Sequence, residues 1–149
     1  VLVGPNTWFP LAWVSKKQTV TSRSTTESEI VSLAYSLYIE GIPTLAHWDL
    51  FCGREVELEV MEDNQASIII VKAGWSPKLR HVARTHQVNL GSLGEIFGDN
   101  PKDGGTHNKQ ITIQYTDTNV QAADIFTKAL EPQKWNNALN LLGIRTDLK

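Results

Sequence analysis

The segment VELEVMEDNQASIIIVKAG, residues 56–74, changes its hydrophobic pattern midway, and this change limits the folds open to the chain. Val56, Leu58 and Val60 alternate with acidic residues, as the side chains of a half-buried β-strand do. After Asn64 the apolar residues no longer alternate and indicate a short helix. A strand that leads directly into a helix predicts an α/β fold built of layers.

The remaining patterns also alternate strands with helices. A capping-box pattern at Ser24, in which Glu27 has a sufficient structural role, predicts the start of a helix that Gly41 and Pro43 end. A second such pattern starts at Thr118. The predicted elements are a β-hairpin around GPNT within 1–15, helices at 25–40, 44–53, 64–74, 118–130 and 132–142, strands at 56–62 and 111–115, and a loop over 91–110.

Size and composition correspond to one ordinary domain. The chain has 149 residues, of which 41% are hydrophobic, and we expect residues 1–149 to fold together. No apolar run approaches the ~20 residues that span a bilayer and no signal-peptide pattern is present, so a soluble intracellular protein is expected. The single cysteine, Cys52, permits no internal disulfide and is expected to be a small buried hydrophobe.

Positive charge is concentrated in residues 71–90. The net charge of −2 argues against nucleic-acid binding through overall charge alone. Residues 71–90 contain no acidic residue, and their basic side chains are Lys72, Lys78, Arg80, His81, Arg84 and His86. A phosphate-facing surface and the solvated face of a helix both remain open interpretations. Since His81 and His86 lie five residues apart, which does not suit a helical zinc site, they are expected to be ordinary histidines.

Three carboxylates occupy positions that local structure does not fully explain. Asp63 follows a strand, where it lines a ligand crevice if the strand is parallel, but capping of the next helix explains it equally well. Glu29 continues the apolar row of Leu33 and Leu37. Asp124 adjoins the apolar stripe of its predicted helix, beyond the expected first turn. None of the three has a basic partner in the local pattern, so Mg²⁺ binding is the economical explanation of such a cluster.

Four motifs, in order along nearly the whole chain, resemble one family. They are WVSKKQTVTSRSTTESEIVSLA, EDNQASIII, RHVARTHQ and IQYTDTNVQAADIFTKAL, and LGIRT follows near the end. Each motif alone is weak, but four in sequence at family-like spacing are specific. The chain resembles the ribonuclease H domain at the end of copia-type retrotransposon polyproteins.

The resemblance implies a ribonuclease H-like fold, with a mixed sheet flanked by helices, and an endonuclease that hydrolyses the RNA strand of RNA–DNA hybrids during reverse transcription. It implies that Glu29, Asp63 and Asp124 are catalytic and belong to a four-carboxylate site for two Mg²⁺ ions, or Mn²⁺ in their place. The side chains expected to contact nucleic acid are Lys16, Lys17, Gln18, Asn64, Gln65 and Arg80. Asn64 and Gln65 are also compatible with a surface turn without a binding role.

The resemblance further implies an upstream reverse transcriptase domain as a partner, in a cytoplasmic particle or the nucleus. The family's first strand, central in its sheet and bearing the first catalytic Asp, has no counterpart here. We therefore expect a domain that is partial at its N-terminus and, in isolation, weakly active or inactive. Two alternatives stay open: a decayed or repurposed domain that binds nucleic acid without cutting it, and a plain α/β interaction domain.

Overall fold

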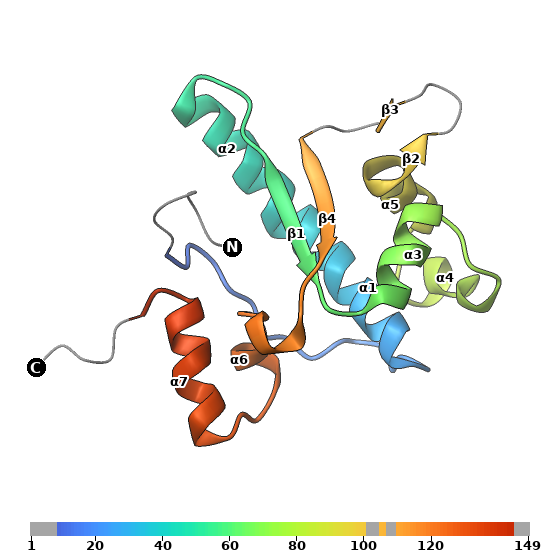
Figure 1. Ribbon diagram of the computed structural model, residues 1–149. Coiled ribbons are helices and arrows are strands. Elements are labelled where there is room, and N and C mark those ends of the chain that lie inside the picture. Colours follow the sequence, from blue (N-terminus) through green and yellow to red (C-terminus); the bar gives the residue numbers. More distant parts are fainter. Residues whose placement is uncertain (1–8, 101–104, 107–109, 145–149) are drawn as a thin grey trace, which may run out of the picture. The chain divides into compact units, whose positions relative to one another are not determined.

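The structure, a computed structural model, describes residues 9–100, 105–106 and 110–144 (Figure 1). The described residues form two compact units. We call the one between residues 18 and 115 the central unit, and the one made of residues 9–17 and 116–144 the terminal unit. The architecture is mixed α/β, with helices and a two-stranded parallel sheet.

The central unit begins with a long helical path and then alternates strands with helices. Its elements are α1 Thr25–Ser36, η1 Leu37–Gly41, α2 Ile42–Cys52, β1 Leu58–Glu62, α3 Gln65–Ala73, η2 Pro77–Leu79, α4 Val82–Thr85, α5 Leu90–Phe97, β2 Asp99–Asn100, β3 Gly105–Thr106 and β4 Ile111–Tyr115. β2 and β3 pair as a short antiparallel ribbon.

The parallel sheet consists of β1 and β4, which lie side by side (Figure 1). Leu58 pairs with Ile111 and Val60 with Ile113, and all four side chains belong to the core or pack against it. This confirms the two predicted strands and the alternation within the first. Because side chains repeat every two residues along a strand, buried Glu62 continues the inner row of β1.

The helical path from α1 to α2 does not stop at Gly41 and Pro43, so the predicted break there is wrong. The η1 segment is a π-helix, in which the Ile42 N–H donates to the Leu37 carbonyl. Pro43, which has no N–H to donate, is the second residue of α2 and directly follows the π-helical segment, without ending the helical path. The path ends at Gly53, which has a positive φ of 65° and is the predicted helix end.

The predicted loop over residues 91–110 is wrong in its first part, because α5 occupies Leu90–Phe97. The Asn89 side chain caps this helix by accepting hydrogen bonds from the Gly91 and Ser92 N–H groups. Gly94 permits close packing: a Cβ there would lie 2.5 Å from the Gly74 Cα. Gly94 therefore serves helix packing and not loop flexibility.

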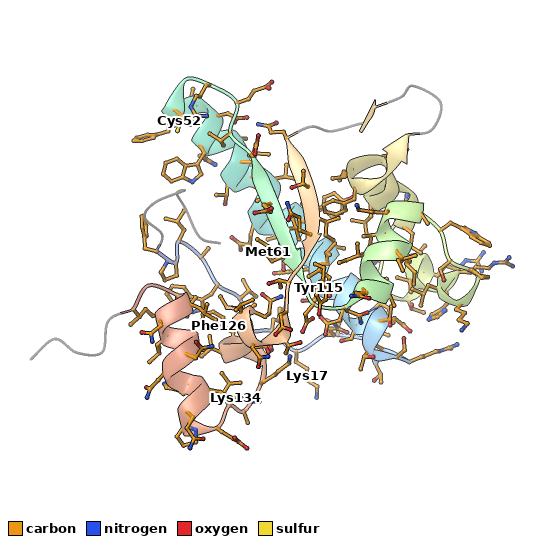
Figure 2. All side chains as sticks on the ribbon, in the orientation of Figure 1. Lys17, Cys52, Met61, Tyr115, Phe126 and Lys134 are labelled. Atoms are coloured by element: carbon orange, nitrogen blue, oxygen red, sulfur yellow. The ribbon has the colours of Figure 1, made fainter. Side chains whose placement is uncertain are left out.

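The core of the central unit is contributed by helices and both strands of the parallel sheet. Its fully or almost fully buried members include Ile30, Leu33, Leu37, Val71, Val82, Leu93, Phe97, Ile111 and Ile113. Cys52 is not among them: it ends α2 and is exposed, which corrects the expectation of a buried thiol (Figure 2). Within the described ranges, no helix has the length and apolar character needed to cross a membrane.

The terminal unit contains η3 Thr118–Val120, α6 Asp124–Thr127 and α7 Pro132–Leu141. The Trp13 and Phe126 rings stack with centroids 6.1 Å apart, and Ser15 Oγ donates to the Phe126 carbonyl at 2.7 Å. The predicted last helix is confirmed by α7. Part of the predicted hairpin, residues 1–8, lies outside the described residues, and residues 11–15 have no regular secondary structure.

The predicted helix over residues 118–130 is much shorter in the structure. Its proposed cap, Thr118, instead begins η3, and the cap is Asp117, whose side chain accepts a hydrogen bond from the Asn119 N–H. The α-helix starts only at Asp124. Asp124 is thus a first-turn residue, where a negative charge is favourable at a helix N-terminus.

Candidate active site and the surrounding polar network

Three carboxylates interact electrostatically near the end of β1. Glu62 is 7% exposed and lies at the last position of β1, and Asp63 follows it directly. Glu29, on α1, and Asp63 are both close enough to Glu62 for their charges to act on its carboxyl group. Two of the three predicted ligands, Glu29 and Asp63, thus act electrostatically on Glu62, a carboxylate that was not among the predicted ligands.

The electrostatics of Glu62 reflect this crowding. Burial raises the pKa of the Glu62 carboxyl to about 7, and the negative charges of Glu29 and Asp63 act in the same direction. Asn64 opposes the shift, since its N–H donates to Glu62 Oε1 at 3.0 Å. A carboxyl that titrates near neutral pH beside two others is a common feature of functional sites.

The role of Asp63 was left open between a helix cap and a functional carboxylate. The cap of α3 is the next residue, Asn64, whose Oδ1 accepts hydrogen bonds from the Ala66 N–H at 3.0 Å and the Ser67 N–H at 3.2 Å. Capping therefore does not account for Asp63. β1 and β4 are parallel, as the crevice interpretation required.

Asp124 belongs to the terminal unit and has a partner that the sequence analysis overlooked. Lys128 Nζ lies 2.8 Å from Asp124 Oδ2, one helical turn later. The expectation that Asp124 lacks a basic partner is therefore wrong. The joint convergence of Asp124 with Glu29 and Asp63 stays a prediction.

The donor chemistry at the end of β1 suits a hard divalent cation, because carboxylate oxygens are the ligands that Mg²⁺ prefers and the like charges need neutralising. The arrangement itself is not that of a finished metal centre. In the described part of the chain, no group of three or more His, Cys, Asp or Glu side chains could hold a metal ion.

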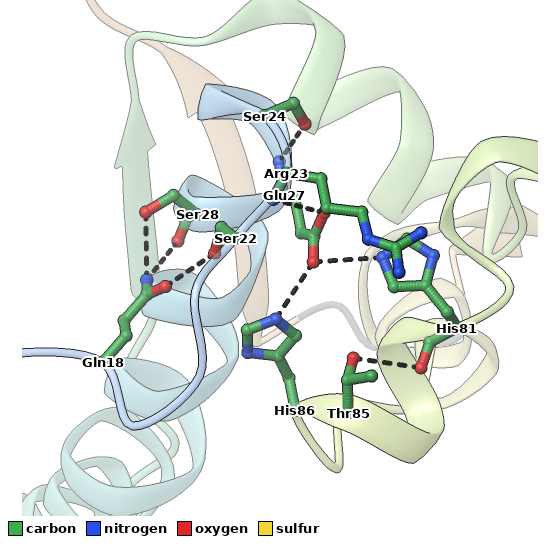
Figure 3. A network of polar contacts seen from close by, with 9 residues as sticks. All are labelled: Gln18, Ser22, Arg23, Ser24, Glu27, Ser28, His81, Thr85 and His86. Carbon is green, nitrogen blue, oxygen red and sulfur yellow. Dashed lines mark hydrogen bonds and ion pairs between the residues drawn. The ribbon is translucent and has the colours of Figure 1, made fainter.

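Glu27, two residues before Glu29, is the centre of a separate polar network (Figure 3). Its N–H donates to Ser24 Oγ at 3.1 Å, as the capping box predicts, and its Oε2 accepts from the Arg23 N–H at 3.1 Å. Its Oε1 lies 3.1 Å from His81 Nε2 and 3.0 Å from His86 Nε2. We call Glu27, His81 and His86 the glutamate clamp.

The glutamate clamp gives a specific structural partner to His81 and His86, which were expected to be ordinary surface or core histidines. They flank α4 as its N-cap and C-cap residues, so the short helix turns both rings toward the same oxygen. An ionised carboxylate only accepts hydrogen bonds, so each ring contributes an Nε2–H. Burial alone raises the pKa of the Glu27 carboxyl, but the hydrogen bonds from Arg23, His81 and His86 outweigh it and leave that pKa below its ordinary value.

The residues expected to contact nucleic acid fall into two groups. Gln18 and Asn64 have structural bonds: Gln18 Nε2 donates to the Ser28 carbonyl at 2.9 Å and Gln18 Oε1 accepts from Ser22 Oγ at 2.8 Å (Figure 3). The members of the second group have exposed side chains and are Lys16, Lys17, Gln65 and Arg80. Arg80 lies over the ring of Trp75, with its Cζ 5.8 Å from the ring centroid.

Comparisons of the chain with protein-family models, with curated proteins and with solved structures found no match.

Proposed function

We propose that the chain is a ribonuclease H-type domain of a copia-type retrotransposon polyprotein, which hydrolyses the RNA strand of RNA–DNA hybrids with Mg²⁺ during reverse transcription. The observation that carries this proposal is the group of carboxylates at the end of β1, where Glu29 and Asp63 act on the buried Glu62. The four motifs of the sequence add the resemblance. The polyprotein's reverse transcriptase domain and the RNA–DNA hybrid are the partners.

The finer fold assignment, a ribonuclease H-like mixed sheet flanked by helices, is part of the same proposal. It is supported by the parallel pairing of β1 with β4 and by the packing of α3 against both strands and against α1. A parallel pair requires a crossover connection, and here the chain between β1 and β4 contains α3, α4 and α5.

In this proposal Glu29, Asp63 and Asp124 hold the metal. When bound, Mg²⁺ would provide an activated water and charge stabilisation for a displacement at phosphorus. The Asn64 N–H donates to Glu62 Oε1 at 3.0 Å and so orients the Glu62 carboxyl. Asp124 has to exchange its contact with Lys128 for one with the metal.

The test uses a labelled RNA–DNA hybrid and the complete chain of 149 residues. Mg²⁺ is expected to strengthen hybrid binding, and Glu29→Gln or Asp63→Asn to remove that gain. Glu95→Gln, an exposed acidic residue on α5, is the matched control and should leave it intact. Cleavage is expected to be slow, since the resemblance supplies three of four carboxylates and one lost charge contact typically costs ~10²–10³ in rate.

A non-catalytic nucleic-acid-binding domain is the second candidate. The ion pair of Asp124 with Lys128 favours it, because it satisfies one proposed ligand without a metal. This candidate predicts hybrid binding that responds neither to Mg²⁺ nor to Glu29→Gln. A chain that binds no hybrid at all would contradict both candidates and leave the plain α/β interaction domain.

A further inference from the structure

A shallow pocket of about 270 Å³ opens in the central unit, between the end of α3 and the start of α5. η2 and α4 contribute its other wall. Its lining includes Trp75, Leu79, Arg80, Val88, Leu90 and Gly91. The pocket thus combines an aromatic ring, apolar side chains and one guanidinium group, and no acidic residue lines it.

Trp75 is the most conspicuous part of the pocket. Its side chain is 60% exposed, although tryptophan is among the largest apolar side chains. The Arg80 guanidinium lies 5.8 Å from the ring centroid, close enough for a cation–π contact. The arrangement holds a flat apolar surface and a positive charge next to each other in contact with solvent.

Further positive charge lies on the elements that flank the pocket. Lys78 on η2 and Arg84 on α4 are exposed, and residues 71–90 contain no acidic residue. Across the described ranges, neither Lys78, Arg80 nor Arg84 forms an ion pair, whereas Lys128 does. Unpaired cations around a pocket attract an anion such as a phosphate group.

The glutamate clamp fixes this surface to the rest of the unit. His81 adjoins Arg80 in sequence, and His86 ends the helix that carries Arg84. Both rings bond to Glu27 on α1, the helix that also carries Glu29. The segment that bears the cations is therefore held on the same helix as a proposed catalytic carboxylate.

We propose that this pocket binds one nucleotide of single-stranded nucleic acid, with its base against Trp75 and its phosphate at Arg80. That the ligand is a nucleic acid rests on the proposed function. The preference for a single strand follows from the pocket itself. Bases in a duplex are stacked and paired, so they cannot reach an aromatic ring. Binding of a duplex backbone would need only the cations and not the ring.

The experiment measures the binding of a fluorescent oligo(dT) of about twelve nucleotides to the complete chain, in EDTA, by anisotropy. Trp75→Ala is expected to weaken binding about tenfold or more, the usual effect of losing one stacked base, and Trp75→Phe to retain most of the affinity. Arg80→Ala should reduce the slope of log K against log salt concentration by about one, the effect of losing one phosphate contact. Because Trp75 is largely exposed, the thermal midpoint should not change.

Trp135→Ala is the matched control, since Trp135 is 44% exposed and lies on α7 in the terminal unit. Three results would each overturn the proposed nucleotide pocket. They are an equal loss of oligonucleotide affinity in the two tryptophan variants, no binding of the oligonucleotide, and a loss of duplex affinity with Trp75→Ala that equals the loss of oligonucleotide affinity. The assay contains no metal and no cleavage step. Trp75-dependent binding therefore supports the pocket even if hybrid cleavage fails, and Trp75-independent binding overturns it while the nuclease proposal stands.

Discussion

Glu27 and Glu62 are both buried glutamates of the central unit, yet their surroundings are opposite. Glu27 is 1% exposed and accepts hydrogen bonds from the Arg23 N–H and two imidazole rings. Glu62 is 7% exposed, accepts a hydrogen bond from the Asn64 N–H and has two negative neighbours. The pKa of Glu27 is lowered and that of Glu62 is raised.

The difference separates a structural carboxylate from a candidate functional one. At Glu27 the protein supplies donors that satisfy the ionised group, so the buried charge stabilises the fold. At Glu62 the protein supplies further negative charge, and the site stays electrostatically unsatisfied until a proton or a cation binds. α1 takes part in both sites, through Glu27 and Glu29.

The largest effect is expected from removal of the glutamate clamp. Glu27→Ala leaves three buried or partly buried N–H donors without an acceptor and should lower the free energy of unfolding by about 3 kcal/mol. Glu27→Gln should cost about 1 kcal/mol, because the amide oxygen can still accept from a histidine but the NH₂ group cannot accept from the Arg23 N–H. Urea unfolding of each variant measures these losses.

Exposed Glu95 on α5 provides the control, and Glu95→Ala should change stability by no more than about 0.5 kcal/mol. If Glu27→Ala costs no more than this control, the clamp does not stabilise the unit and the contrast with Glu62 disappears.

A medium effect is expected from Glu62→Gln, measured against pH in EDTA. The folded pKa of Glu62, about 7, lies above its ordinary value, so the native state binds the extra proton and Glu62 destabilises the fold as pH rises through 7. The variant lacks this titration and should be about 2–3 kcal/mol more stable than the parent at pH 8, since each unit of pKa shift corresponds to about 1.4 kcal/mol. For Glu27 the sign is reversed, and its stabilisation should fade as pH falls below the ordinary carboxyl pKa.

Urea midpoints of parent and Glu62→Gln should thus coincide below the ordinary carboxyl pKa, at about pH 4, separate as pH rises to about 7, and stay apart at pH 8. Parallel profiles for the two proteins would show that burial and the two negative neighbours do not raise the pKa of Glu62.

The sequence predicted those parts of the fold that depend on local pattern. The capping box at Ser24, the strand alternation around Val60 and the helix end at Gly53 all have local signals, and all are confirmed. The helix over 90–97 also had such signals, an Asn89 cap and apolar residues at helical spacing, but its glycines suggested a loop. Their reason is the approach of Gly94 to Gly74, a tertiary contact that no local pattern shows.

The site was predictable only in part, for the same reason. Glu29 and Asp63 were selected because each departed from its local pattern, and the structure brings both to Glu62. Glu62 occupies the inner row of the strand, where the alternation calls for an apolar residue. A charged residue in that row was the signal that could have identified it. In the glutamate clamp, Glu27 is separated from His81 by 54 positions and from His86 by 59 positions. At such separations sequence spacing carries no information.

The smallest effect is expected at Asp124. Its electrostatic surroundings are intermediate: it has one cationic partner, whereas Glu27 has several hydrogen-bond donors and Glu62 has two negative neighbours. Its partner Lys128 is 48% exposed, so the pair at one helical turn is screened by solvent and worth about 0.3–0.5 kcal/mol. Lys128→Met should therefore lower stability by no more than that amount. If Asp124 binds Mg²⁺, the same variant removes a competitor and should raise Mg²⁺ affinity about twofold, the equivalent of that energy. Lys134→Met on α7 is the control, and a titration in which both lysine variants change Mg²⁺ affinity equally would remove Asp124 from the proposed metal site.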